Sequence, residues 1–403
     1  VDLSHNPGIT DYSPLRSRDL RILNLSNNNL SDVSFIKSFS QVYRAGKPQH
    51  LSGGMLSLAL LDLSNNQISD VSFLEETLSV GTLNLSGNEI SKIGKISYGL
   101  GFLDLSGNKI QGSASFEQTA YIGGLNLSRN PIKDISFLSD SKKLRVLDLS
   151  YPVDGRRIYD SKLFSLLENL EELTTLNLSH ATSVSGYDIS GLKKLRGLTA
   201  LDLSGTGFGG DFTPLKELHW LKTLTLTHSS IKDLSPLNEL KHLTTVNLSY
   251  CDFQDINTLT HLKNVTSLNL ADIDKDLGEL EFRDYSFLGN MWGLKSLNLS
   301  GAKISDISQF DRLQSLWELN LSRIAVRSKH DVKMEFRDIR EHPYDEITFP
   351  KMLRNLRTLD LSDAQGSPFI DNIALLNKKN EEEFDNLNCL TTLNLSGTDM
   401  PMS

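Results

Sequence analysis

The segment 205–210, which reads Gly-Thr-Gly-Phe-Gly-Gly, is the closest approach in this chain to a motif that performs chemistry. The spacing G-x-G-x-x-G binds dinucleotide phosphates when the glycines join a strand to the N-terminus of a helix in a parallel sheet. A strand is expected just before it, at Leu201-Asp202-Leu203. That strand belongs to a short sequence repeat, however, and within such a repeat we expect the glycines to form a turn.

The other residues that could carry catalysis or bind a metal are scattered. The sequence contains no H-E-x-x-H, C-x-x-C, G-x-S-x-G or G-x-x-x-x-G-K-[ST] motif, and its nine histidines are dispersed. Aspartates recur at strand centres, where they alternate with asparagine and have no second acid or base beside them: Asp2, Asp62, Asp104, Asp148, Asp202 and Asp360. We therefore expect no enzyme active site, no metal site and no cofactor in this chain.

A phrase that returns sixteen times, such as Leu83-Asn84-Leu85-Ser86, indicates the elements that position these residues. Seven of the fifteen intervals between phrases are 22 residues. The pattern L-x-x-L-x-L-x-x-N resembles the leucine-rich repeat, in which each unit is one short strand and a return segment. Its second leucine serves as a marker: Leu3, Leu25, Leu63, Leu85, Leu105, Leu127, Leu149, Leu178, Leu203, Leu226, Leu248, Leu270, Leu299, Leu321, Leu361 and Leu395.

The return segment has its own pattern, I-x-D-[IVL]-S-x-[LI], seen at residues 132–138 and 231–237. This pattern on a 22-residue unit resembles the short repeats of internalins, a family of bacterial surface proteins, and of related phosphatase-regulating repeat proteins. The fold class that we expect is α/β, a right-handed leucine-rich repeat solenoid or horseshoe of about 16 repeats. A curved parallel sheet should line the concave face, and short helical or 3₁₀ returns the convex face.

The regularity of the repeats changes along the chain. We predict one domain over residues 1–403, with regular units in 1–150 and irregular units with insertions in 151–403, notably at 323–350. Residues 39–54 form another insertion, and the apolar spacing of 163–170 predicts a true helix. In the regular part an asparagine ladder should connect successive turns through Asn6, Asn28, Asn66, Asn88, Asn108 and Asn130.

Composition restricts the partners and the compartment. A net charge of -9 and a pI near 5.5 disfavour nucleic acid as the main partner. No run of 18 apolar residues predicts a transmembrane segment. Cys251 and Cys389 lie too many repeats apart to form a disulfide. These features favour a bacterial cell-surface or secreted protein, although an intracellular one stays open, and further domains or caps are expected outside this chain.

The residue after the serine of each repeat varies most, whereas the strand-centre column is nearly all Asn or Asp. Arginine and tyrosine, which are enriched at interface hot spots, gather in this column between the sixth and twelfth units. The predicted partner-binding residues on the concave face are Arg129, Tyr151, His180, His228, Tyr250 and Asp272. A secondary apolar patch is predicted at Ile22, Leu60, Phe102 and Val146, and the insertion at 323–350 is the rival location for binding.

The function that these features favour is non-catalytic recognition of a protein partner, as in an internalin-like protein that contacts a host. Two alternatives stay open. The chain is the targeting domain of a larger enzyme whose catalytic domain lies elsewhere, or it is an architectural repeat protein without a selective partner. Exposed residues vary freely in repeat proteins, so the fold does not reveal the partner's identity.

Overall fold

The computed structural model of this chain describes thirteen segments: residues 1–17, 20–37, 57–75, 79–96, 99–153, 163–181, 188–208, 210–253, 255–274, 281–304, 308–326, 355–364 and 389–398. The insertion predicted at 39–54 and most of the one at 323–350 lie outside these residues. The chain divides into two compact units, Val1–Pro214 (unit 1) and Leu215–Ser403 (unit 2). The single domain expected over 1–403 stays a prediction.

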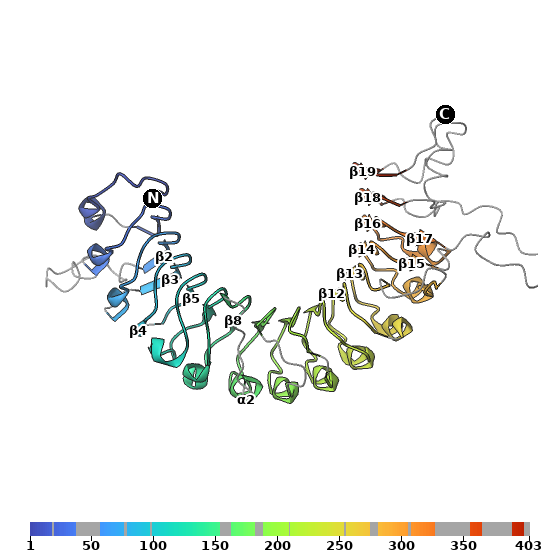
Figure 1. Cartoon of the computed structure of the whole chain (residues 1–403), viewed down its shortest axis with the longest axis horizontal. Helices are drawn as coiled ribbons and strands as arrows, with labels where there is room; N and C mark the ends of the chain where they lie inside the picture. The colour runs from blue at the N-terminus through green and yellow to red at the C-terminus, as the bar shows by residue number, and fades with distance from the viewer. Residues whose placement is uncertain are drawn as a thin grey trace, which may run out of the picture. The chain divides into compact units, whose positions relative to one another are not determined.

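In unit 1 the short strands run parallel and follow one another in chain order (Figure 1). Each begins at least one residue before the repeated phrase and ends at its Asn or Asp. The strands are β1 (Ile22–Asn24), β2 (Ser57–Asp62), β3 (Ser79–Asn84), β5 (Phe102–Asp104), β7 (Gly124–Asn126), β8 (Val146–Asp148), β9 (Thr175–Asn177) and β10 (Ala200–Asp202). A two-stranded pair, β4 (Gly94–Lys95) with β6 (Phe116–Gln118), lies outside this series.

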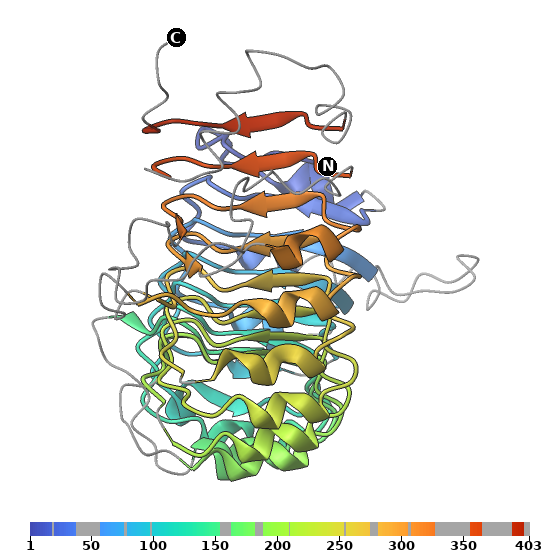
Figure 2. The same ribbon diagram turned by 90° about the vertical axis from the view of Figure 1, so that its right-hand side faces the viewer.

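Unit 2 repeats the arrangement, again with parallel strands in chain order (Figure 2). They are β11 (Thr223–Thr225), β12 (Thr245–Asn247), β13 (Ser267–Asn269), β14 (Ser296–Asn298), β16 (Glu318–Asn320), β18 (Thr358–Asp360) and β19 (Thr392–Asn394). The register is constant, so equivalent residues of successive repeats lie on neighbouring rungs. A small parallel pair joins β15 (Lys303–Ile304) and β17 (Ala325–Val326).

The returns are 3₁₀ helices, as the sequence predicts, and the aspartate of the return motif starts them. Asp32 Oδ1 accepts the N–H of Ser34 at 2.7 Å, and Asp233 Oδ1 accepts that of Ser235 at 2.8 Å. The helices are η1 (Ser13–Ser17), η2 (Ser34–Ile36), η3 (Ser72–Glu75), η4 (Ser113–Ser115), η5 (Ser136–Asp140), η7 (Ile189–Lys194), η8 (Thr213–Glu217), η9 (Ser235–Glu239), η10 (Ile256–His261), η11 (Ser286–Asn290) and η12 (Ser308–Arg312). The true helix expected within 163–170 is present as α2 (Leu163–Leu167).

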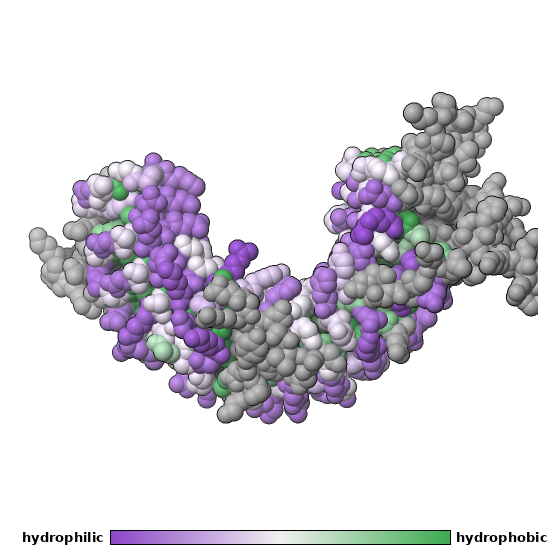
Figure 3. All heavy atoms as spheres, viewed as in Figure 1, coloured by the Kyte–Doolittle hydropathy of each residue, from purple (hydrophilic) through white to green (hydrophobic). Residues whose placement is uncertain are grey.

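The core of each repeat lies between the strand and its return. Leu83 and Leu85, the two leucines of β3's phrase, are fully buried, and each such side chain contributes about 2 kcal/mol through burial. The face of the described residues seen in Figure 3 is mostly hydrophilic, as expected when the apolar side chains point inward. Among the described residues no helix is long and apolar enough to span a bilayer.

In the regular repeats of unit 1, buried asparagines connect one turn to the next. Asn88 Nδ2 donates to the carbonyls of Leu63 and Leu85, both at 3.0 Å, and its Oδ1 accepts the N–H of Ile68 at 3.0 Å. The same pattern recurs at Asn108. In later repeats the main chain closes the turn instead, as where the N–H of Ala302 donates to the Leu299 carbonyl.

Candidate recognition surface

The Asn or Asp that ends a strand closes the turn that follows it. Asn298 Oδ1 accepts the N–H of Ser300 at 3.0 Å, and Asp202 Oδ1 accepts that of Ser204 at 2.8 Å. Only an oxygen acceptor is required, which explains why the two residue types alternate. Gly205 and Gly207 follow in left-handed backbone, with φ of 60° and 64°, so the G-x-G-x-x-G segment begins in a turn as predicted.

The variable column follows directly after the strands and continues their hydrogen-bond ladder, as where the Arg129 N–H donates to the Ser150 carbonyl at 2.9 Å. Its place on the concave face stays a prediction. Each strand of the series ends at the Asn or Asp, or at Thr225 in β11, and the residue three positions later has left-handed backbone in every repeat. This left-handed row has φ of 57° at Arg129, 50° at Tyr151, 57° at His180, 56° at His228, 59° at Tyr250, 55° at Asp272 and 53° at Arg323, and it holds glycine at 87, 107, 205, 301 and 397. Glycine adopts this conformation freely, whereas other residues lose about 1–2 kcal/mol in it.

In unit 1 the row brings two predicted residues together. The rings of Tyr151 and His180 stack with centroids 4.4 Å apart and planes 29° apart. Gly205 follows, and a Cβ at that position would lie 2.3 Å from the His180 imidazole, so glycine makes room for the ring. Arg129 is exposed one repeat before Tyr151.

In unit 2 the row forms a continuous set of contacts. The rings of His228 and Tyr250 stack with centroids 4.4 Å apart and planes only 9° apart. A hydrogen bond with the Asp272 carboxylate, together with its negative charge, raises the pKa of the Tyr250 hydroxyl above its ordinary value. Asp272 thus orients the Tyr250 hydroxyl through this hydrogen bond.

Arg323, which the sequence had not singled out for binding, completes this set. Its Nη1 and Nη2 donate to Oδ1 and Oδ2 of Asp272, both at 2.9 Å, and Nη2 also donates to Ser300 Oγ at 2.8 Å. The contact crosses Gly301, where a Cβ would lie 2.5 Å from Asp272 Oδ1. The hydrogen bond to Asp272 raises the pKa of the guanidinium.

Asp272, predicted to contact a partner directly, is instead buried, with 8% of its surface exposed. Tyr250 hydrogen-bonds to its carboxylate, and Arg323 forms a two-pronged ion pair with it. Asp272 therefore holds the two exposed side chains in place. The sequence could not show this pairing, because Arg323 lies two repeats further on and borders the insertion at 323–350.

The predicted apolar patch lies at the other end of the strands and consists of two pairs. Ile22 is exposed beside Leu60, its partner in register on β2. Phe102 reaches over Gly124, where a Cβ would lie 2.5 Å from the Phe102 ring, and Val146 is the register partner of Gly124. Leu60, Phe102 and Val146 are each half-buried, so the patch exposes less apolar surface than the sequence suggests.

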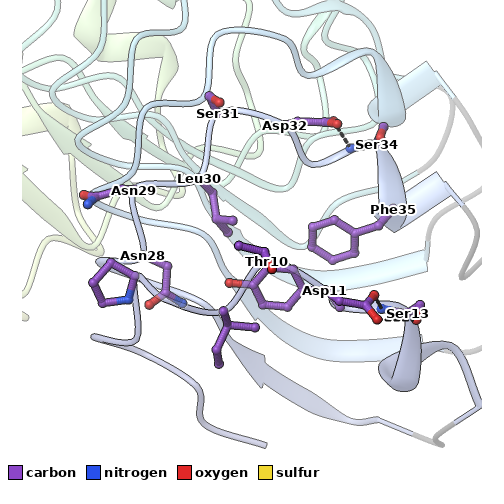
Figure 4. Close-up of a pocket in the computed structure, with 13 residues that line it drawn as sticks. Thr10, Asp11, Ser13, Asn28, Asn29, Leu30, Ser31, Asp32, Ser34 and Phe35 are labelled. Atoms are coloured by element: carbon purple, nitrogen blue, oxygen red, sulfur yellow. Dashed lines mark hydrogen bonds between the residues drawn. The ribbon is translucent and has the colours of Figure 1, made fainter.

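A cavity of about 400 Å³ lies between the first two returns of unit 1 (Figure 4). Tyr12 lines it and stacks on Phe35, with centroids 4.9 Å apart. The Tyr12 hydroxyl is buried and has no hydrogen-bond partner among the described residues. Its burial raises the pKa of the phenol.

The same return position in unit 2 holds Tyr285, whose hydroxyl donates to Asp274 Oδ2 at 2.7 Å. Asp274 is fully buried and also accepts the Arg283 Nε at 2.6 Å and the Lys303 N–H at 2.9 Å. Burial raises the pKa of Tyr285 far above its ordinary range. The Asp274 carboxylate thus accepts three hydrogen bonds, as expected for a buried carboxylate in a structural ion pair. Among the described residues no three His, Cys, Asp or Glu side chains are arranged to hold a metal ion.

Comparison with known proteins agrees with this geometry. Residues 19–41 and 239–256 match models of the Leucine Rich Repeat family. The chain has the leucine-rich repeat fold. None of the curated proteins compared matches its sequence.

Solved structures show which leucine-rich repeat proteins share the fold. An internalin (inlF) of Listeria monocytogenes has 21% identity and a TM-score of 0.51, over 94% of this chain and 81% of its own. A leucine-rich repeat protein of Leptospira interrogans has 20% identity and a TM-score of 0.56, over 80% and 83%. The mouse RP105/MD-1 complex has 21% identity and a TM-score of 0.62, over 98% of this chain and 62% of the matched chain. The predicted resemblance to internalins and the predicted solenoid are confirmed.

Proposed function

We propose that this leucine-rich repeat protein is a non-catalytic module that recognises a protein partner through its left-handed row. The observation that carries the proposal is the presence of Arg129, Tyr151, Tyr250 and Arg323 in left-handed backbone. Bulky residues are rare there, and each costs about 1–2 kcal/mol relative to a relaxed conformation. Glycine fills the same turn in other repeats, so the turn itself does not require a large side chain.

The residues of the row also have the character of a binding surface. Tyrosine and arginine are the types that most often dominate interface energies. In unit 2 the His228–Tyr250 stack and the Arg323–Asp272 ion pair fix the side chains before a partner arrives. A surface that is already ordered loses less conformational entropy on binding. A partner that offers hydrogen-bond acceptors beside an apolar or aromatic group would complement it.

The comparisons support the general form of this proposal. The mouse structure with the same fold is that of an RP105/MD-1 complex. A bacterial setting and contact with a host follow from the resemblance of the return motif to internalins and remain part of the proposal. If the chain is the targeting domain of a larger enzyme, the left-handed row would have the same role, since targeting also requires binding to a partner.

The test replaces row residues by glycine, which the same turn already accepts in five repeats. In one variant His228, Tyr250, Asp272 and Arg323 all become glycine, which also avoids leaving Asp272 without its cation. Wild-type and variant chains are immobilised and exposed to a protein extract, and the captured proteins are quantified by mass spectrometry. A protein retained only by the wild type is then purified and titrated by calorimetry.

A second variant changes Arg129, Tyr151 and His180 to glycine and tests unit 1 by itself. We expect at least one of the two variants to lose about 2 kcal/mol of binding free energy, the scale of an interface hot spot. The melting temperature should not fall, because glycine relieves the backbone. Equal capture and equal affinity for both variants would refute the proposal and move the site to the insertion at 323–350.

A further inference from the structure

The tryptophans of this protein are unusually placed. The chain has three, Trp220, Trp292 and Trp317, and their exposed fractions are 57%, 67% and 46%. Tryptophan is on average a highly buried residue, because its ring carries a large apolar surface. All three lie in unit 2, in the segments that lead directly into strands. They are therefore exposed on the edge of the sheet opposite to the left-handed row.

This amino edge consists of the six segments that precede β11, β12, β13, β14, β16 and β18: residues 219–222, 241–244, 263–266, 292–295, 314–317 and 355–357. Its charge is one-sided. The six segments contain no Asp or Glu and carry the five cations Lys222, Lys241, Lys263, Lys295 and Arg357. The chain as a whole has an excess of acids, 50 against 41 Lys and Arg, so the amino edge is a local reversal of charge.

The strand register places these side chains on consecutive rungs. Because Ser296, Glu318 and Thr358 are partners in register, the residues just before them, Lys295, Trp317 and Arg357, are neighbours too.

Backbone hydrogen bonds confirm the order. The Trp317 N–H donates to the Lys295 carbonyl at 2.9 Å, and the Arg357 N–H donates to the Trp317 carbonyl at 2.7 Å. An exposed indole thus lies between two cations, with neighbouring rungs about 4.8 Å apart.

Two of the exposed rings, Trp317 and Trp220, are held by neighbouring side chains. The Arg357 guanidinium lies over the Trp317 ring at 5.9 Å from its centre, a cation–π contact. Trp220 stacks on His242 with centroids 4.7 Å apart and planes 14° apart. Within the described part of the chain no carboxylate lies within salt-bridge distance of Lys222, Lys295 or Arg357. The cations are therefore available to an external anion.

We propose that the amino edge of unit 2 is a second docking surface, which binds an acidic segment of a protein partner. The cations match a series of carboxylates, and the exposed indoles supply the apolar contact that anchors protein interfaces. The net charge of -9 of the whole chain disfavours nucleic acid as the occupant. Arginine over a ring keeps its N–H edge for a two-pronged carboxylate contact.

The experiment uses the tryptophans as the signal, because all three belong to this surface. The probe is a tryptophan-free peptide of alternating glutamate and leucine, about eight residues long, which when extended spans the six rungs. It is titrated into the full chain while the intrinsic fluorescence is recorded. We expect a saturable change, weakened by added salt, and no saturable change with a peptide that carries lysine in place of glutamate.

Charge-neutral variants locate the effect. The double variant Lys295→Gln and Arg357→Gln should bind the acidic peptide at least about tenfold more weakly, a difference of 1.4 kcal/mol. The matched control, Arg145→Gln with Arg196→Gln, changes equivalent segments of unit 1 and should bind like the wild type. Far-UV circular dichroism should be the same for all three chains.

The proposal is overturned if the acidic peptide gives no saturable change or binds the double variant as tightly as the wild type. Tighter binding of an oligouridylate of similar length would also overturn it and would assign the edge to single-stranded nucleic acid. The left-handed row takes no part in this test. A chain with glycine at His228 and Tyr250 should bind the peptide normally, so this inference and the proposed function can fail separately.

Discussion

Replacement of Asn88 by alanine should remove most of one rung of the ladder in unit 1. The side chain satisfies three buried backbone groups, the N–H of Ile68 and the carbonyls of Leu63 and Leu85. The Leu63 carbonyl keeps the Asn66 Nδ2 donor at 3.0 Å, and the Leu85 carbonyl keeps the Asn108 Nδ2 donor at 2.9 Å. The N–H of Ile68 would be left unpaired. At about 1–3 kcal/mol for one buried unpaired group, the loss should be about 2 kcal/mol.

Urea denaturation followed by far-UV circular dichroism measures this loss, and hydrogen exchange locates it. The Ile68 amide should exchange much faster in the variant, since its acceptor is gone. Ser229→Ala is the matched control, because Ser229 occupies the same repeat position outside the ladder, and it should cost less than about 1 kcal/mol. Equal losses for the two variants, or an unchanged Ile68 amide, would refute the view that the asparagine bonds stabilise these turns.

Three further predictions follow from the described contacts. Tyr12→Phe should leave the free energy of unfolding unchanged or raise it, because the hydroxyl is buried without a partner among the described residues. Tyr285→Phe should instead lower it by about 1.5–3 kcal/mol, because a hydrogen bond to a buried carboxylate is lost. Urea denaturation curves of the two variants and the wild type compare these effects. Arg129→Gly should be more stable than Arg129→Ala by about 1 kcal/mol, since only glycine relaxes the left-handed backbone. Equal denaturation midpoints for the two variants would contradict this. Backbone N–H bonds lower the pKa of Asp32 and Asp188 in the folded state. The stabilisation that these two carboxylates give is therefore present above the unfolded pKa and is lost as pH falls below about 4. Thermal melts should show a melting temperature that falls in this range, and changing both residues to asparagine should make that fall smaller.

The repeating parts of the fold could be predicted because they recur with the same chemistry. The phrase around Leu83 and Leu85 gives alternating burial, and the aspartate of the return, where it is present, fixes the start of the 3₁₀ helix. The left-handed conformation of the variable column had a visible signal as well. Glycine stands there in five repeats, and glycine after a strand commonly marks positive φ.

The pairings within the site could not be predicted, because they depend on where side chains reach in space. Arg323 contacts Asp272 across the intervening Gly301, and no local pattern connects residues 51 positions apart. The amino edge was missed for another reason. Its residues precede the strands and read as ordinary loop positions, and only the register shows that Lys295, Trp317 and Arg357 fall on successive rungs. Whether the row binds a partner stays a prediction.

The distribution of tryptophan has a practical consequence for how unfolding of this protein is observed. Trp220, Trp292 and Trp317 all belong to unit 2, so indole emission reports that unit and is silent about unit 1. Circular dichroism, in contrast, records the backbone of both. If the two units melt independently, as linear repeat arrays can, the two spectroscopies will give different midpoints for one sample. A two-state fit to emission alone would then assign to the whole chain a stability that belongs to its second half.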